Sequence, residues 1–241
     1  MKKVNNKFKS QIYCDTADIS LIKKLSSSLL VRGFTTNPSL MKIAGAKDYK
    51  KYAIKLIKIC NKKPISLEVF ADEENAIEEQ ANVINSWGNN VYVKIPVVNT
   101  KGKFLGKVIK KLSSKGFKLN ITAVYDLKQV QKILEILNKK SNTIISIFVG
   151  RMADTGKDPL PIIKKSVQIS KKYKNIKILW ASTREAYNYT QSCDCLCDII
   201  TMPPNIIKKI GKFGKSSKNL TVSTVKAFYE DAVNAKFKIK K

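Results

Sequence analysis

Short runs of aliphatic and β-branched residues alternate along this chain with longer segments in which apolar residues recur every three or four positions. The short runs have the length and composition of buried strands, and the longer segments have the period of amphipathic helices. In one such segment Val130, Ile133 and Leu137 fall on a single helical face. The expected strands cover residues 11–14, 32–35, 65–69, 91–95, 118–123, 143–149, 176–181 and 198–202.

The expected helices lie between these strands, and one further amphipathic segment closes the chain. They cover residues 19–28, 49–61, 74–87, 104–114, 127–139, 160–173, 185–191 and 204–210, with the closing helix at 222–233. Eight strand–helix units predict a single-domain α/β fold over residues 1–241, a (β/α)8 TIM barrel with a basic N-terminal extension at 1–10. An open doubly wound sheet is the alternative, which the lack of a glycine-rich phosphate loop after the first strand disfavours.

The formal net charge of +28 would suit a nucleic-acid-binding protein. However, arginine occurs only at positions 32, 151 and 184, and no nucleic-acid motif is present. Lysines are instead spread over the expected helices, in pairs such as Lys110-Lys111 and Lys164-Lys165. We therefore expect solvated helix faces and no specific nucleic-acid partner.

We expect no membrane span, because no long uncharged apolar run occurs, and no secretion signal, because no apolar run follows the basic segment MKKVNNKFKS. Five cysteines, an odd number, favour reduced thiols in the cytoplasm. Cys193, Cys195 and Cys197 lack zinc-site spacing, and the chain has no histidine, so we expect thiols at a helix end and no metal.

Polar residues end most of the expected strands at i, i+2 spacing, which places them on one face. In a barrel, side chains at the carboxyl ends of the strands line the active-site mouth. The sequence therefore predicts a polar cavity there, formed by Tyr13 and Asp15, Thr35 and Asn37, Ser66, Glu68 and Phe70, Tyr92 and Lys94, Asn120 and Thr122, Ser146 and Phe148, and Ser182 and Arg184.

Lys94 lies within the apolar run VYVKIP. Burial disfavours its ammonium form, and a neutral amine can attack a ketone to form a Schiff base. The residues leave open a plain ion pair with Asp15 or Glu68. Because histidine is absent, acid–base work would fall to a carboxylate, lysine, tyrosine, cysteine or bound water, and Asp15 and Glu68 are the inward-facing candidates.

Two of the arginines, Arg151 and Arg184, follow the sixth and seventh expected strands. A planar guanidinium matches phosphate oxygens in two places, and barrels often bind phosphate near their last strands. The alternative is a structural salt bridge at the rim.

The order and spacing of six motifs resemble the transaldolase family, in particular its short single-barrel members. The resemblance runs from about residue 11 to residue 231. The motifs are Asp15-Thr16-Ala17-Asp18, Thr35-Thr36-Asn37-Pro38-Ser39-Leu40, Val93-Lys94-Ile95-Pro96, Asn120-Ile121-Thr122, Phe148-Val149-Gly150-Arg151 and Ala181-Ser182-Thr183-Arg184.

This resemblance implies a class I aldol transfer of the kind found in the pentose phosphate pathway, without a metal or organic cofactor. A ketose phosphate would be cleaved, its dihydroxyacetone unit would stay on Lys94 as a Schiff base, and an aldose phosphate would accept it. Asp15 would handle the C4 hydroxyl proton, and Glu68 and Thr122 would hold the catalytic water. The implied substrate-binding residues are Asn37, Asn120 and Ser146 for hydroxyls, Phe148, and Arg151, Ser182 and Arg184 for phosphate.

Glu68 and Phe148 resemble the transaldolase pattern, since the fructose-6-phosphate aldolase-like branch typically has glutamine and tyrosine there. The stretch Ala123-Val124-Tyr125 is more similar to the aldolase pattern, and no proline separates Ser146 from Phe148. Trp180 replaces a small residue and, by strand parity with Ser182, would narrow the barrel interior. An aldolase, an enzyme of an unusual sugar phosphate and a non-catalytic basic binding protein remain as alternatives.

The closing helix, with Phe228, Tyr229 and Asp231, resembles the helix that short family members pack on a neighbouring subunit. The resemblance implies a homo-oligomer, a pentamer or decamer. The alternative is that this helix covers its own barrel.

Overall fold

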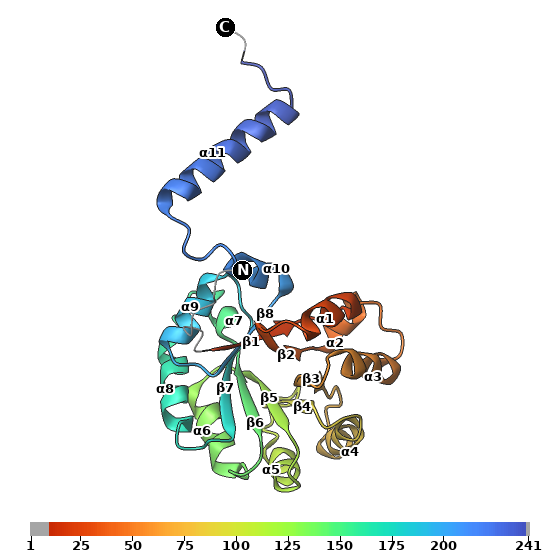
Figure 1. Ribbon diagram of the computed structural model, residues 1–241. Coiled ribbons are helices and arrows are strands. Elements are labelled where there is room, and N and C mark those ends of the chain that lie inside the picture. Colours follow the sequence, from red (N-terminus) through yellow and green to blue (C-terminus); the bar gives the residue numbers. More distant parts are fainter. Residues whose placement is uncertain (1–9, 240–241) are drawn as a thin grey trace. The chain divides into compact units, whose positions relative to one another are not determined.

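The computed structural model describes residues 10–239, in which eight parallel strands close into a barrel in chain order (Figure 1). Each strand pairs with the next, and β8 pairs with β1. The predicted TIM barrel is therefore confirmed, and the open sheet was wrong. The strands are β1 (Gln11–Asp15), β2 (Val31–Thr35), β3 (Ile65–Glu68), β4 (Val91–Pro96), β5 (Leu119–Val124), β6 (Thr143–Ile147), β7 (Ile176–Trp180) and β8 (Ile199–Met202).

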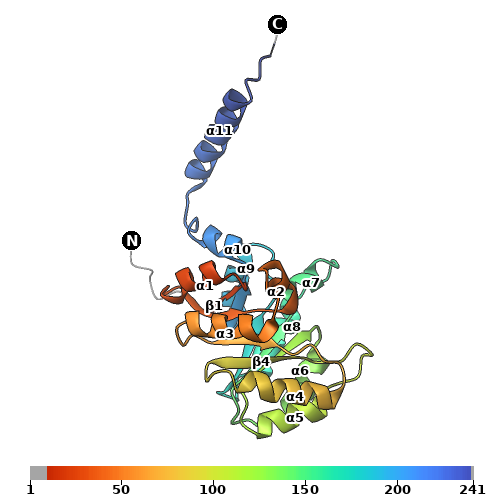
Figure 2. The same ribbon diagram turned by 90° about the vertical axis from the view of Figure 1, so that its right-hand side faces the viewer.

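Helices follow the strands and cover the outside of the barrel, with α3, α4 and α5 in chain order along one side (Figure 2). Val130, Ile133 and Leu137, predicted to share a helical face, are all buried. The helices of this part are α1 (Ile19–Ser26), α2 (Pro38–Ile43), α3 (Tyr49–Ile59), α4 (Glu74–Asn85), α5 (Gly106–Ser114), α6 (Leu127–Ile136), α7 (Val149–Ala153), α8 (Leu160–Ser170), α9 (Tyr187–Asp194) and α10 (Pro204–Ile210).

Two short helices, α2 and α7, were not predicted. Helix α2 begins with Pro38 in its first turn, and the Asn37 side chain caps it by accepting from the Leu40 N–H at 2.8 Å. At α7 the apolar run was predicted to continue as strand, but β6 ends at Ile147 and the chain turns into a helix at Val149. Neither helix is long enough to show a helical period in the sequence.

The chain divides into two compact units, one up to Ile207 and one from Lys208 onward. The second unit contains α11 (Ser217–Asn234), which begins before the predicted 222–233 because Ser216 accepts from the Asn219 N–H as its cap. No residue of α11 is buried, and its exposed apolar residues include Leu220, Val225, Phe228 and Tyr229.

Surface features of the described residues agree with the predicted solvated faces. The pairs Lys110-Lys111 and Lys164-Lys165 are exposed. None of the helices between residues 10 and 239 combines the length and the apolar character needed to cross a bilayer. Most of the predicted basic extension, residues 1–9, lies outside the described residues.

Candidate active site

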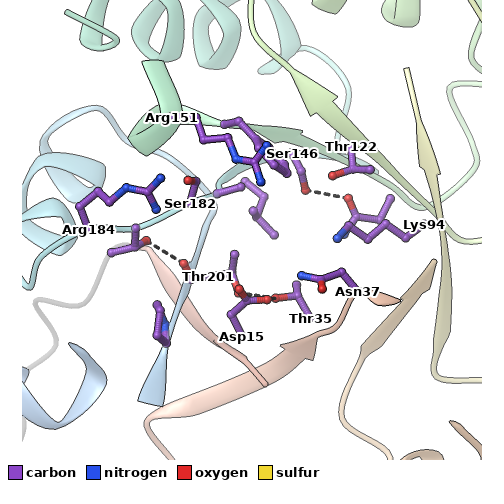
Figure 3. Close-up of a pocket in the computed structure, with 16 residues that line it drawn as sticks. Asp15, Thr35, Asn37, Lys94, Thr122, Ser146, Arg151, Ser182, Arg184 and Thr201 are labelled. Carbon is purple, nitrogen blue, oxygen red and sulfur yellow. Dashed lines mark hydrogen bonds between the residues drawn. The ribbon is translucent and has the colours of Figure 1, made fainter. Parts of the chain in front are cut away.

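A cavity of about 220 Å³ opens where the strands of the barrel end (Figure 3). Ten of the eleven residues to which the resemblance assigns a role line it, and Glu68 is the exception. The ten are Asp15, Asn37, Lys94, Asn120, Thr122, Ser146, Phe148, Arg151, Ser182 and Arg184. Strand parity was wrong for Tyr13, Ser66, Phe70 and Tyr92, which do not line this cavity.

The strand register explains why the central residues meet. Glu68 of β3 is paired with Lys94 of β4, and Lys94 is paired in turn with Asn120 of β5. Across the barrel, Asp15 of β1 is paired with Thr35 of β2. Paired residues of neighbouring strands point to the same face of a sheet, so these side chains lie side by side at one level of the barrel.

Lys94 is buried, and its amine makes two contacts. Its Nζ lies 2.9 Å from Oε2 of Glu68 and donates to the carbonyl of Thr36 at 3.1 Å. The ion pair left open by the sequence is therefore present, and Glu68 rather than Asp15 is the partner. An ammonium has three N–H donors, so these two contacts leave one for the cavity.

Thr122, next to this pair, has a buried hydroxyl without a hydrogen-bond partner among the described residues. A buried hydroxyl is costly to leave unpaired, and this one borders the cavity. The predicted role of Glu68 and Thr122, which is to hold a water molecule, is consistent with an open donor and acceptor at this position.

A second group of hydrogen bonds orders the residues predicted to bind substrate hydroxyls. Ser146 donates to Oδ1 of Asn120 at 2.7 Å, and Nδ2 of Asn120 donates to Ser66 at 3.0 Å. Because Oδ1 of Asn37 is occupied as the cap of α2, its Nδ2 is the group available to a ligand. These contacts fix the orientation of each side chain before any ligand binds.

Asp15 lies in a third group that includes a residue the sequence analysis did not select. The Thr35 hydroxyl donates to Oδ1 of Asp15 at 2.6 Å and also lies 2.5 Å from Oγ1 of Thr201. Burial raises the pKa of Asp15, and the hydrogen bond from Thr35 and the charge of Lys94 oppose this rise. Thr201 lines the cavity from β8, and its signal in the sequence was one polar residue in an apolar strand.

The arginines lie opposite Lys94 in Figure 3. Nε and Nη2 of Arg184 bind the Asp154 carboxylate at 3.0 Å and 2.5 Å, and this pairing lowers the pKa of Asp154. The guanidinium of Arg151 lies 5.5 Å from the centre of the Phe148 ring. The rim salt bridge left open by the sequence thus exists at Arg184, and it leaves Nη1 free of Asp154.

Gly150 brings the two arginine-bearing segments together. A Cβ atom at Gly150 would lie 1.7 Å from the backbone oxygen of Ser182, so only glycine permits this contact. Ser182 itself has a φ of 65°, a left-handed conformation that is costly for a non-glycine residue. The contact places Arg151 of α7 near Ser182 and Arg184.

The expectation for Trp180 was wrong. Leu179 and Ala181 of the same segment line the cavity, whereas Trp180 is buried on the opposite side, against a separate cavity that includes Leu160 and Gly150. The left-handed turn at Ser182 breaks the alternation of side chains, so Ser182 reaches the cavity without sharing a face with Trp180. Trp180 therefore does not narrow the barrel interior.

The predicted helix-end position is confirmed for Cys193, in the last turn of α9, and for Cys195, its C-cap, but not for Cys197, which lies beyond the helix. The Cys197 thiol donates to the carbonyls of Ile178 and Ile199 in the core, and burial raises its pKa. Within residues 10–239, no cluster of three or more histidine, cysteine, aspartate or glutamate residues is arranged to bind a metal ion.

Residues 12–241 match the family described as Transaldolase/Fructose-6-phosphate aldolase. A "Probable transaldolase" of Herpetosiphon aurantiacus is 30% identical over 211 residues, which are 87% of this chain and 91% of that protein. Another from Thermoplasma volcanium is 34% identical over 214 residues, 88% of this chain and 92% of that protein. The crystal structure of KGPDC from Streptococcus mutans is similar in fold alone, with a TM-score of 0.54 at 10% identity over 80% of this chain and 88% of that one.

A closed parallel barrel with polar residues at its strand ends is the architecture of many enzymes. This chain belongs to the transaldolase/fructose-6-phosphate aldolase family, and the family and its named relatives point to an enzyme of the aldolase type.

Proposed function

We propose that this protein transfers a dihydroxyacetone unit from a ketose phosphate to an aldose phosphate through a Schiff base on Lys94, as in the pentose phosphate pathway. The observation that carries the proposal is the buried amine of Lys94, which borders the cavity and lies 2.9 Å from the carboxylate of Glu68. A carboxylate at this distance can accept the proton that the amine must lose before it attacks the ketone carbon.

The steps then follow from the neighbouring groups. The Lys94 nitrogen bonds to C2 of the ketose, and loss of water from the carbinolamine gives the iminium ion. Asp15, as carboxylate, takes the proton of the C4 hydroxyl while the C3–C4 bond breaks. The bonding electrons pass to the iminium as an enamine, and the shortened aldose phosphate leaves. The enamine then attacks the aldehyde of an acceptor aldose phosphate, which forms a new C–C bond and restores the imine. Hydrolysis of this imine frees Lys94.

The phosphate would be bound by Arg151, Ser182 and Arg184. One edge of the Arg184 guanidinium is held by Asp154, which leaves the remaining N–H groups for phosphate oxygens. Asn37, Asn120 and Ser146 would bind hydroxyls between the phosphate and Lys94, and Phe148 would provide an apolar wall. The cavity is small and largely polar in lining, which suits a short sugar phosphate.

The test is borohydride trapping with fructose 6-phosphate, followed by peptide mass spectrometry. We expect a three-carbon adduct on Lys94, and no adduct in Lys94→Met. Addition of erythrose 4-phosphate before reduction should remove the adduct and form a seven-carbon ketose phosphate. A folded wild type that forms no adduct with any of a panel of ketose phosphates would contradict the proposal and favour the non-catalytic alternative.

The choice between transfer and simple cleavage depends on two residues. Glu68→Gln together with Phe148→Tyr introduces the pattern of the aldolase-like branch, so we expect a larger share of released dihydroxyacetone. The ratio of transferred to released unit, measured with and without erythrose 4-phosphate, would report this change. An unchanged ratio would mean that these residues do not decide between the two reactions.

We also propose that the protein self-associates through α11 and resides in the cytoplasm. The exposed Leu220, Val225, Phe228 and Tyr229 support self-association, because apolar patches on a helix are usually covered by a partner. All five cysteines are free, which supports a reducing compartment. Light scattering on the full chain and on Phe228→Glu would test the association, a pentamer or decamer being expected only for the wild type.

A further inference from the structure

The Asp15 carboxylate is at one end of a line of hydrogen bonds that joins three side chains, each from a different strand. Thr35 of β2 lies 2.6 Å from Asp15, and Thr201 of β8 lies 2.5 Å from Thr35. Thr35 and Thr201 are both buried. At these distances, the three groups form one continuous line of hydrogen bonds (Figure 3).

The chemistry of the groups fixes the direction of this line. An ionised carboxylate only accepts, so the single Thr35 hydroxyl hydrogen points to Asp15. The Thr35 oxygen must then accept, and the hydrogen between the two threonines comes from Thr201. A donor whose own oxygen accepts a hydrogen bond is polarised and donates more strongly. The direction reverses only when Asp15 carries a proton.

We propose that Thr201 is a positioning residue that acts through Thr35 to hold Asp15 as an ionised, proton-accepting carboxylate. This rests on the proposed function, in which Asp15 takes the C4 hydroxyl proton during cleavage. Burial raises the pKa of Asp15, so without support a larger fraction would be protonated and unable to act as base. The two threonines oppose this effect without adding a charge to the cavity.

The other groups near Asp15 do not replace this support. Lys94 of β4 faces Asp15 and lowers its pKa, but the Lys94 amine is paired with Glu68. On β1 itself, burial raises the pKa of Cys14 to about 12 and raises that of Tyr13, so both stay neutral. Thr201 is the outermost hydroxyl of the line. Thr183 donates to the backbone oxygen of Thr201 at 2.7 Å, and this bond does not involve the Thr201 hydroxyl.

The test uses full-length protein labelled with ¹³C at the aspartate carboxyl carbons. The Asp15 resonance is assigned with Asp15→Asn and titrated by NMR in the wild type and in Thr201→Val. We expect the midpoint to rise by about half to one pH unit in Thr201→Val, which is the size of one neutral hydrogen bond. Thr201→Ser should restore the wild-type midpoint, and Thr35→Val should raise it further.

Thr183→Val is the matched control, because it removes a neighbouring buried hydroxyl outside the line and should leave the midpoint unchanged. The acid limb of kcat/KM for ketose phosphate cleavage should move with the NMR midpoint. An unchanged midpoint in Thr201→Val, or a Thr201→Ser midpoint equal to that of Thr201→Val, would overturn the proposal. Thr201→Ala replaces the valine variant if that does not fold. Absence of cleavage in the wild type would count against the proposed function, while the titration would still test the line.

Discussion

Lys63, just before β3, and Lys94, within β4, both direct their amines toward other parts of the protein. The two amines differ in the atoms that they contact. The Lys63 Nζ donates to the carbonyls of Leu25, Ser28 and Val31 at 3.0, 2.7 and 2.6 Å. These three contacts use every N–H donor of the ammonium. Lys63 therefore joins the end of α1 and the start of β2 to the loop before β3, and its amine has no donor left for a ligand.

Lys94 contacts one backbone carbonyl and one carboxylate, whereas the three contacts of Lys63 are all with carbonyls. Burial lowers the pKa of Lys63, but the backbone carbonyls that it contacts cannot accept a proton at neutral pH. In the proposed mechanism Glu68 accepts the proton of Lys94, and a ketose bound in the cavity supplies the carbon that the freed amine attacks. If the proposed function is right, removal of a lysine amine from solvent is not enough for reactivity, because an adjacent proton acceptor and an open cavity are also required.

The largest expected effect is a difference in catalytic activity between variants of Lys94 and Lys63. Lys94→Met should lower transfer of the dihydroxyacetone unit by roughly 10⁴-fold or more, because the covalent intermediate is lost. Lys63→Met should keep the wild-type kcat per folded molecule. Coupled assays at a temperature where both variants are folded would measure this, and comparable losses in the two would remove the distinction.

The next largest effect is expected on the free energy of unfolding, and it concerns Lys63. Lys63→Met should lower the free energy of unfolding by about 2–4 kcal/mol, because three carbonyls lose a charged donor. Urea unfolding, followed by circular dichroism, would measure the loss. Lys63→Arg is the control, because its guanidinium retains donors for the carbonyls. A Lys63→Met protein as stable as the wild type would show that water replaces the amine at no cost.

A subtler change makes the surroundings of Lys94 similar to those of Lys63. Glu68→Gln keeps the shape of the side chain but removes the proton acceptor, so imine formation should slow by about 10²-fold. The rate of adduct formation under borohydride trapping would report this step directly. Unchanged trapping would mean that the Lys94 proton leaves by another route.

The smallest effect is expected for an exposed lysine pair. Lys101 lies 3.5 Å from Glu73, with side chains that are 76% and 74% exposed. Solvent screens such a pair, so Lys101→Ala should change neither the melting temperature nor activity measurably. A clear loss of stability in this variant would show that surface charge matters more in this chain than burial suggests.

The sequence alone determined where the eight strands lie along the chain and most of the cavity lining, because hydrophobic runs and side-chain alternation are local properties. Asp15, Lys94 and Thr122 could be selected from parity within single strands. The motifs also identified the family that the comparisons show. These features can be predicted because they depend on residues that are close together along the chain.

Only the tertiary structure decided which partner each side chain meets. The register of β3 with β4 places Glu68, and not Asp15, beside Lys94. The left-handed turn at Ser182 brings Ser182 to the cavity although Trp180, two residues earlier, faces outward. Thr201 became part of the site because β8 closes the barrel beside β1. Lys63 went unnoticed because its three acceptors lie more than thirty residues earlier in the chain. Such contacts depend on how the strands pair and close, which no local pattern encodes.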